Sequence, residues 1–325
     1  MALKTGTLKN DKYHDPRRPV AIWKSEDLLG DKSVASLTVI LRTIGCRWNR
    51  CTMCGYASEG APATVDDLLM QFAQALQRVS PDDKIIKIYT SGSFLDPREV
   101  PEAARNRILD TIREKGIERL VIESRPEHIT PERVNDCLSK VETEFAIGLE
   151  TSSDLIRENI IRKGFSFSDF TAASEMIHDH GGRVKAYLLL KPPMLSEGGA
   201  LLDAISSARA ARPYADTLSL NLCNIQRGTY VERLWERGEY RPPWLWSAVE
   251  ILKSVDGPII CDPVGAGTKR GPHNCGKCDA SISEAIRKHA ITQESNAFDG
   301  LDCKCRKTWQ KVMDLEEHSF GTVLD

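Results

Sequence analysis

The chain has 325 residues, of which 41% are hydrophobic and 28% are charged, and this composition is typical of a globular protein with an apolar core. Its 44 Lys and Arg residues against 46 Asp and Glu residues give a formal charge of −2, which excludes a histone-like protein that is basic throughout. No apolar run approaches the ~20 residues of a membrane-spanning helix, and residues 1–15 lack the apolar centre of a secretory signal. We therefore expect a cytoplasmic protein with no membrane partner.

Strands and helices alternate along the first two thirds of the chain. Runs of β-branched and apolar residues predict six strands, at residues 36–43, 84–90, 118–123, 144–150, 183–190 and 216–222. Apolar residues at helical spacing predict helices between them, at residues 64–79, 101–115, 167–180 and 200–211. Two further helices are predicted, one that begins at residue 131 and one that ends at residue 160. Six strand–helix units predict an α/β fold with a parallel sheet that is either doubly wound or barrel-like.

Polar residues stand at the carboxyl end of each predicted strand: Arg42, Thr90, Glu123, Glu150, Lys191 and Asn224. In a barrel the loops at this end converge on the active-site mouth, whereas in a doubly wound sheet they converge only where the strand order reverses. Six such positions favour the barrel-like arrangement.

The pattern changes after a tryptophan-containing helix predicted at residues 242–255. From Gly257 onward we expect glycine, proline and cysteine to interrupt any long regular run, as in a small unit held together by a metal. The predicted division is an N-terminal extension (1–35), a partial barrel (36–256) and a cysteine-rich C-terminal domain (257–325).

Ten cysteines in a chain without a secretory signal indicate metal or redox chemistry rather than disulfides. Cys137 and Cys223 lie in apolar patterns and are expected in the core. Three others lie within the run GCRWNRCTMCGY (residues 45–56), in the loop after the first predicted strand. A structural zinc ion requires four ligands, and no fourth cysteine or histidine is near. A [4Fe–4S] cluster held by three cysteines would leave one iron free for a ligand from outside the protein.

A second group consists of Cys275, Cys278, Cys303 and Cys305. The two-residue spacing of the first pair is typical of zinc sites, and the second pair would complete four thiolate ligands. Because the one-residue spacing of the second pair is tight, Cys261 or His273 is an alternative ligand. A second iron–sulfur cluster is the alternative metal.

The three-cysteine loop and the six strand–helix units together resemble the radical S-adenosylmethionine (radical SAM) superfamily. The resemblance implies a (βα)6 partial TIM barrel in which Cys46, Cys51 and Cys54 hold the catalytic [4Fe–4S] cluster, whose open iron binds the methionine part of SAM. It extends to TSGSF (residues 90–94), where the superfamily has a glycine-rich stretch that receives the SAM amino group. It also includes GLET (residues 148–151), where a polar side chain often holds the SAM ribose.

Further motifs resemble Elp3-like enzymes and, more closely, the radical SAM subunits of archaeosine synthase. The segment ESRPE (residues 123–127) is similar to the Elp3-like Glu-Thr-Arg-Pro segment, and the archaeosine synthase resemblance rests on it together with residues 45–56, TSGSFLD (90–96) and GPHNC (271–275). The resemblance implies that SAM, or for the last three the substrate, is contacted by Thr90, Ser91, Gly92, Ser93, Glu123, Arg125 and Glu150.

The activity that this resemblance implies is a lyase reaction in archaeal tRNA modification. The enzyme would cleave the C–N bond of a lysine adduct on the 7-deazaguanine base at tRNA position 15, leaving archaeosine. Its implied partners are tRNA, the lysine-transferring subunit of archaeosine synthase and an electron-donating reductase. The alternatives are another radical SAM enzyme of tRNA modification, Elp3-like or thiol-inserting, and a non-catalytic tRNA-binding module whose cysteines all bind zinc.

Charge in the C-terminal region bears on the nucleic-acid partner. Residues 264–311 hold nine Lys and Arg against five Asp and Glu, a difference of +4 in a chain whose formal charge is −2. This segment is either a solvated surface around the metal site or a patch that contacts tRNA phosphates.

Overall fold

The computed structural model describes residues 14–323 and the side chains up to residue 316, so residues 1–13 of the predicted N-terminal extension lie outside it. Its centre is a sheet of eight strands whose order in space follows their order in the chain. Strands β2 to β8 are parallel, and β1 pairs antiparallel with β2. The strands are β1 (Ala21–Leu29), β2 (Lys32–Ile40), β3 (Asp83–Tyr89), β4 (Arg119–Glu123), β5 (Glu142–Glu150), β6 (Arg183–Leu190), β7 (Thr217–Leu222) and β8 (Ile259–Ile260).

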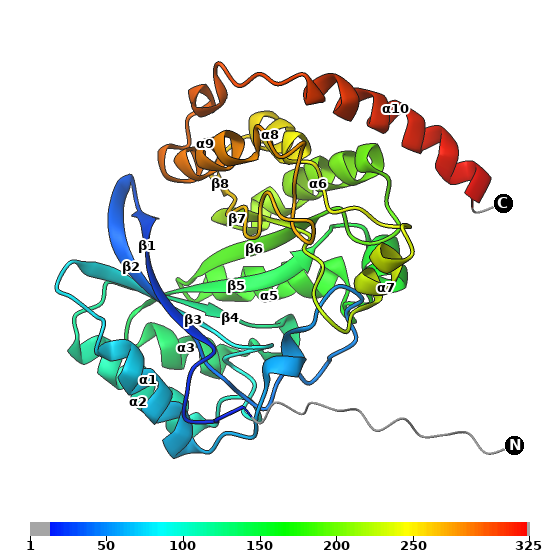
Figure 1. Ribbon diagram of the computed structural model, residues 1–325. Helices are drawn as coiled ribbons and strands as arrows, with labels where there is room; N and C mark the ends of the chain where they lie inside the picture. Colours follow the sequence, from blue (N-terminus) through cyan, green and yellow to red (C-terminus); the bar gives the residue numbers. More distant parts are fainter. Residues whose placement is uncertain (1–13, 324–325) are drawn as a thin grey trace, which may run out of the picture.

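Helices follow the parallel strands and pack outside the curved sheet, which gives the partial barrel that the sequence predicted (Figure 1). Among residues 14–323, no helix combines the length and the apolar character that crossing a bilayer requires. The α-helices are α1 (Val65–Leu76), α2 (Glu102–Glu114), α3 (Pro131–Leu138), α4 (Asp154–Ile156), α5 (Phe167–Asp179), α6 (Glu197–Ala211), α7 (Tyr230–Glu236), α8 (Leu245–Ser254), α9 (Asp279–Thr292) and α10 (Cys305–Val323).

Local signals explain where several helices begin. Thr64 and Ser166 each form a capping box with an aspartate three residues later, at the start of α1 and α5. Ser196 caps α6, so this helix begins before the apolar pattern that predicted it from residue 200.

The amino-terminal part of the sheet differs from the prediction. β2 covers Lys32–Ile40 rather than residues 36–43, because it forms a hairpin with the unpredicted strand β1. Gly30 makes this turn with φ of +60°, a conformation that glycine adopts without steric cost. Charged residues interrupt the apolar pattern of β1, and one of them, Lys24, pairs with Asp83 at 2.8 Å.

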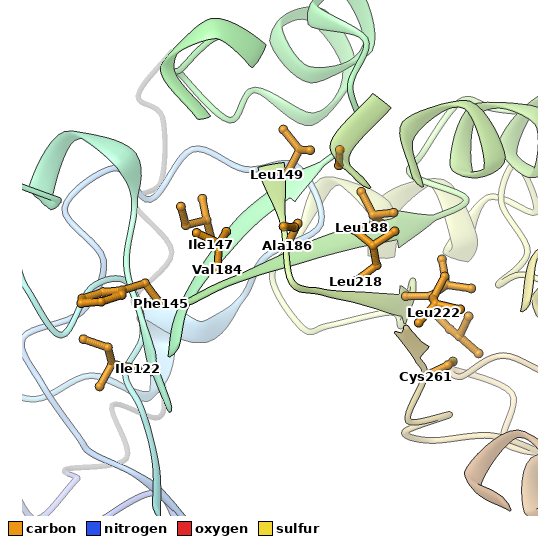
Figure 2. Close-up of a cluster of buried hydrophobic side chains, with 14 of the residues drawn as sticks. Ile122, Phe145, Ile147, Leu149, Val184, Ala186, Leu188, Leu218, Leu222 and Cys261 are labelled. Atoms are coloured by element: carbon orange, nitrogen blue, oxygen red, sulfur yellow. The ribbon is translucent and has the colours of Figure 1, made fainter. Parts of the chain in front are cut away.

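The hydrophobic core lies between the sheet and its helices, on the outward face of the strands (Figure 2). Residues such as Phe145, Ile147 and Leu188 are fully buried there. Cys137 is buried in the same core, and Cys223 is buried in a smaller apolar cluster, as expected for both. Cys261 belongs to the main core and lies near Leu222 in Figure 2.

The inward face of the same strands carries paired charges beside a small apolar cluster. Lys87 of β3 pairs with Asp27 at 2.5 Å, and Lys185 of β6 pairs with Glu144 at 2.9 Å. Strand residues alternate between the two faces, so each lysine is flanked by apolar residues that point into the outer core. The barrel interior therefore combines paired charges with a few apolar side chains, whereas the face that packs against the helices carries the main apolar core.

The C-terminal region contains more regular structure than we expected. The glycines, prolines and cysteines after Gly257 do not prevent two helices of 14 and 19 residues, α9 and α10. These residues gather in the loops, and the strand β8 adds a parallel strand beside β7. Helix α10 packs against α6 and extends past it at the edge of the molecule (Figure 1).

Candidate functional site

The loop that carries Cys46, Cys51 and Cys54 is held in place at the carboxyl edge of the sheet by hydrogen bonds of Thr52. The Thr52 amide donates to the Ile161 carbonyl at 2.9 Å, and its hydroxyl donates to the Ile160 carbonyl at 2.8 Å. The Thr52 carbonyl accepts from the first amides of α7 at 3.0 and 3.2 Å. The segment between the second and third cysteine is therefore clamped between the turn after β5 and helix α7.

Cys46 lies directly against Gly92 in the loop after β3. A Cβ atom on Gly92 would stand 2.9 Å from both Cα and Cβ of Cys46, and 2.2 Å from the Glu99 carboxylate. Glu99 accepts hydrogen bonds at 3.0 Å from the Thr43 hydroxyl and the Ser93 amide, so it joins the cysteine loop to the glycine-rich loop. Burial raises the pKa of this carboxyl group to about 7.

The three thiols are partly buried and influence one another electrostatically. Burial raises the pKa of Cys51, and it raises the pKa of Cys54 to about 11. Protonated, partly buried thiols become good ligands when a cation compensates the thiolate charge. Three thiols on one clamped loop are the donor set that a [4Fe–4S] cluster with one open iron requires, so these residues fit that group.

The predicted SAM-binding loop, Thr90 to Ser93, is ordered by its own hydrogen bonds. The Thr90 hydroxyl accepts from the Gly92 amide at 3.2 Å, and the Ser93 hydroxyl accepts from the Arg125 amide at 3.0 Å. The Ser91 hydroxyl reaches the Tyr56 carbonyl at 3.3 Å. This loop thereby contacts both the cysteine loop and the loop after β4.

Glu123 and Arg125 stand at the end of β4. Burial raises the pKa of Glu123 to about 7, against hydrogen bonds from the Tyr187 hydroxyl and the Thr90 backbone. The Arg125 guanidinium donates to Glu127 at 2.5 Å and to the Lys163 carbonyl at 2.9 Å. It also stacks on the rings of Trp48 and Phe165.

Glu150, at the end of β5, pairs with Lys163 at 2.6 Å. Gly148 makes room for this pair, because a Cβ atom there would stand 2.6 Å from the Lys163 amino nitrogen. Burial acts to lower the pKa of Lys163, but the Glu150 carboxylate and Cys51 outweigh it and hold this pKa above its usual range. Glu150 adopts φ of +68°, a strained conformation for a residue other than glycine.

The structure thus brings the predicted residues of four loops together at one edge of the barrel. Sequence reasoning missed Glu99 and Lys163, each of which joins two of these loops. Lys163 lies between the helix predicted through residue 160 and the one predicted from 167, where no structure was assigned. The first of these ends in a π-helical turn, Arg157–Ile161, and the chain leaves it at Arg162 with φ of +61°. Gly164, directly after Lys163, was the signal in the sequence that the helical pattern is interrupted here.

The second cysteine group converges on one point. The ligand atoms of Cys275, Cys278, Cys303 and Cys305 all lie within 4.8 Å of one another. The sulfur separations are 3.9 Å for 275–278, 3.7 Å for 275–303 and 3.5 Å for 278–305. Sulfurs at 2.3 Å from a tetrahedral zinc ion stand about 3.8 Å apart, so these four thiols fit a single ion.

The alternative ligands Cys261 and His273 are not part of this group. Cys261 is buried in the apolar core, and the His273 ring faces the Gly271 carbonyl at 2.8 Å. Both cysteines of the tightly spaced pair reach the centre because Cys303 ends a loop and Cys305 begins α10. Among the side chains of residues 14–316, no other three His, Cys, Asp or Glu ligands converge so closely, and this includes the first cysteine loop.

The basic residues of segment 264–311 are mostly exposed. Eight of the nine lie on the surface, and Arg270 is half-buried against Glu232 at 2.5 Å. Six lysines have no ion pair within the described part of the chain: Lys269, Lys277, Lys288, Lys304, Lys307 and Lys311. The positive charge of this surface is therefore available to an anionic partner.

Comparisons with known proteins agree with this geometry. Residues 40–197 match the model of the radical SAM superfamily. Archaeosine synthase subunit beta of Methanosarcina acetivorans is 45% identical over 94% of this chain and 93% of its own length. The protein of that name from Thermococcus kodakarensis is 42% identical over 90% of this chain and 96% of its own.

A solved structure of the archaeal Methanocaldococcus infernus Elp3, lacking its N-terminus, matches 79% of this chain and 63% of its own with a TM-score of 0.52. At 17% identity this likeness shows a shared fold.

Proposed function

Because the chain belongs to the family of archaeosine synthase subunit beta within the radical SAM superfamily, we propose that it is the C–N lyase of archaeosine formation. Its substrate is tRNA that carries a lysine adduct on the 7-deazaguanine base at position 15. Removal of a hydrogen atom from the lysine portion leads to scission of a C–N bond, and the amidine of archaeosine stays on the base.

The observation that carries this proposal is the position of the three-cysteine loop against Gly92 at the carboxyl edge of the barrel. Cys46, Cys51 and Cys54 would hold the [4Fe–4S] cluster, which supplies one electron for cleaving SAM to methionine and a 5′-deoxyadenosyl radical. The SAM or substrate contacts are assigned to the backbone and side chains of Thr90, Ser91, Gly92, Ser93, Glu123, Arg125 and Glu150.

The barrel residues have a second task, because so reactive a radical must meet only its substrate. The clamped cysteine loop and the Glu150–Lys163 pair lie at the mouth, and the lysines Lys87 and Lys185 of the lumen are each neutralised by a carboxylate. Glu123 is the carboxyl group among the assigned contacts whose pKa burial raises to about 7.

The C-terminal centre is proposed to hold zinc. Its sulfur separations of 3.5–3.9 Å fit one tetrahedral ion, whereas the ligands of a cluster bind separate irons. The exposed lysines around it are proposed to contact tRNA phosphates. The remaining partners are a lysine-transferring subunit, which prepares the substrate, and a reductase, which supplies the electron.

Anaerobic reconstitution with iron and sulfide, followed by assay with dithionite, SAM and lysine-adduct tRNA, tests the proposal. We expect about four iron atoms and one zinc per chain, release of 5′-deoxyadenosine and archaeosine in the tRNA by mass spectrometry. Cys51→Ala is expected to abolish the cluster and both products, and Cys137→Ala serves as the matched control because Cys137 lies in the core.

Different results point to the other candidates. A tRNA product of another mass, together with 5′-deoxyadenosine, would indicate another radical SAM modification. Zinc in place of iron at the first cysteine loop would indicate a non-catalytic tRNA-binding module. No 5′-deoxyadenosine with cluster and substrate both present would refute the proposal.

A further inference from the structure

A hollow of about 560 Å³ opens beside the cysteine loop, outside the residues assigned above to the cluster and SAM. It is lined by Trp48, Arg50, Glu158, Arg162 and Gly164. Such a volume lies within the range of small-molecule sites and is ample for one nucleotide. The lining combines an aromatic ring, two arginines and one carboxylate.

The indole of Trp48 is fixed as the wall of this hollow. Its Nε1 donates to the Arg162 carbonyl at 2.6 Å, and Arg125 stacks on the ring at 5.2 Å. Gly164 lies under the ring with φ of +76°, and a Cβ atom there would stand 2.1 Å from the indole. A ring held at its nitrogen and against the backbone loses little conformational entropy when another ring stacks on it.

The charges of the hollow indicate what the ligand carries. Arg50 and Arg162 are exposed, and neither forms an ion pair within residues 14–316. The Arg50 guanidinium lies over the Trp48 ring, 5.3 Å from its centre. A base that stacks on this ring would therefore take the place of the guanidinium, and the exposed Arg50 side chain would move to the edge of the hollow. Unpaired arginines beside an aromatic ring are the combination that proteins use to bind the phosphates and unstacked bases of single-stranded RNA.

We propose that this hollow binds an unpaired nucleotide of the tRNA, with its base stacked on Trp48 and its phosphates on Arg50 and Arg162. The Glu158 carboxylate is placed to accept from an exocyclic amino group of that base. The ligand is RNA rather than SAM, because two exposed arginines without ion pairs suit successive phosphates, and SAM has no phosphate. This inference rests on the proposed function in taking tRNA as the RNA.

The position of the hollow gives it a role in the reaction. Arg125, which stacks on Trp48, also contacts the Lys163 carbonyl, and Lys163 pairs with Glu150 at the barrel mouth. A nucleotide stacked on Trp48 would therefore be separated from the predicted reaction site only by the Arg125 side chain. Holding an unpaired neighbour there would keep the modified base displaced from its stack while its adduct enters the mouth.

The test measures binding of a full-length tRNA transcript to cluster-loaded protein as a function of salt. Because each lost phosphate contact lowers the slope of log K against log salt by about 0.7 for single strands, Arg50→Glu/Arg162→Glu is expected to lower it by about 1.4. Over the tenfold range from 1 M to 0.1 M salt, the affinity of this variant for tRNA is therefore expected to increase about 25-fold less than that of the wild type. Trp48→Ala is expected to raise Kd roughly five- to 150-fold.

The matched control is Arg107→Glu/Lys115→Glu, which makes the same charge change at the exposed Arg107 of α2 and at the exposed Lys115 that directly follows this helix, and it is expected to leave the slope near wild type. Iron content and cleavage of SAM without tRNA report whether the Arg50/Arg162 variant keeps its cluster site. Unchanged tRNA affinity and slope in that variant would overturn the inference, and so would weaker SAM binding with normal tRNA binding. If the wild type forms no archaeosine but the variant still loses tRNA affinity, the proposed function fails while the nucleotide site stands.

Discussion

Replacing Gly92 with alanine tests whether the glycine-rich loop positions the first cysteine. The new Cβ atom would stand 2.9 Å from Cα and Cβ of Cys46 and 2.2 Å from the Glu99 carboxylate. Ordinary contacts of a Cβ atom begin at 3.4 Å, so Cys46 must move by about 0.5 Å and the carboxylate by more. The carboxylate does not move freely, because Glu99 is held by Thr43 and Ser93, and at Cys46 the new atom meets the backbone Cα itself.

The size of this movement decides the outcome. Metal–ligand distances tolerate only about 0.2 Å, so a shift of 0.5 Å in Cys46 is too large for an unaltered cluster site. Overpacking of a tight site also costs about 1–3 kcal/mol of folding free energy. We therefore expect Gly92→Ala to fold with reduced stability and to lose most of its iron.

The assay is iron and sulfide content after anaerobic reconstitution, together with the visible absorbance of the cluster. Gly198→Ala is the matched control, since Gly198 lies in the first turn of α6 and the nearest atom to its Cβ position is 3.8 Å away. It is expected to keep a full cluster and to gain about 0.4–1 kcal/mol of stability. A full cluster and wild-type SAM cleavage in Gly92→Ala would refute the reasoning.

Three other changes have defined outcomes. Cys305→Ala is expected to lower zinc from about one per chain to near zero by atomic emission, and Cys261→Ala to keep it; equal zinc in both would contradict the four-sulfur centre. The folded-state pKa of Glu99, about 7, lies above the 4.5 of the unfolded chain, so this group lowers stability as pH rises from 4.5 to 7, by about 3 kcal/mol in all. Glu99→Gln is expected to remove this decline. Urea unfolding at pH 5 and pH 8 measures it, and an equal change in unfolding free energy between the two pH values in wild type and variant would disprove it. Lys163→Met leaves the Glu150 carboxylate buried without its partner at 2.6 Å and is expected to lower the free energy of unfolding by about 3–5 kcal/mol. Adding Glu150→Gln is expected to recover most of this loss. Equal stability of Lys163→Met and wild type in urea unfolding would count against the buried pair.

The barrel could be predicted from the sequence because each of its central strands is a short apolar run between helical patterns. β6 has the predicted bounds, and β3, β4 and β7 begin one residue away from them. The outward face of these strands is buried against helices, and this burial produces the apolar signal. β1 and the two-residue β8 have no such signal, because they stand at the open edges of the sheet.

The candidate site could be predicted only where the residues carry a spacing or a motif. The two cysteine groups and the strand-end acids meet this condition. Glu99 and Lys163 do not. Glu99 binds Thr43, which is far away along the chain, and Lys163 reaches the nearer Glu150 only because an unusual turn lies between them. The helices after Gly257 were missed for another reason, since the metal ligands lie in loops and at the start of α10 and leave the helix interiors uninterrupted.

The C-terminal cysteine centre is connected to the barrel mouth by a chain of buried contacts. The Trp246 indole donates to the Cys305 sulfur at 3.3 Å, and the Trp309 indole donates to the Ser247 hydroxyl at 2.8 Å. That hydroxyl donates at 2.5 Å to the fully buried carboxylate of Glu197, which pairs at 2.8 Å with Lys191 directly after β6.

A charged pair buried this deeply is stable only while its remaining hydrogen bonds are made. Here one of the donors to Glu197 is the Ser247 hydroxyl, whose orientation depends on Trp309 of α10. Cys305, the first residue of α10, accepts the Trp246 hydrogen bond from α8, and α8 also supplies Ser247. We therefore expect a metal bound by the four C-terminal cysteines to stabilise the geometry of the barrel mouth, although this centre lies outside the strands of the barrel.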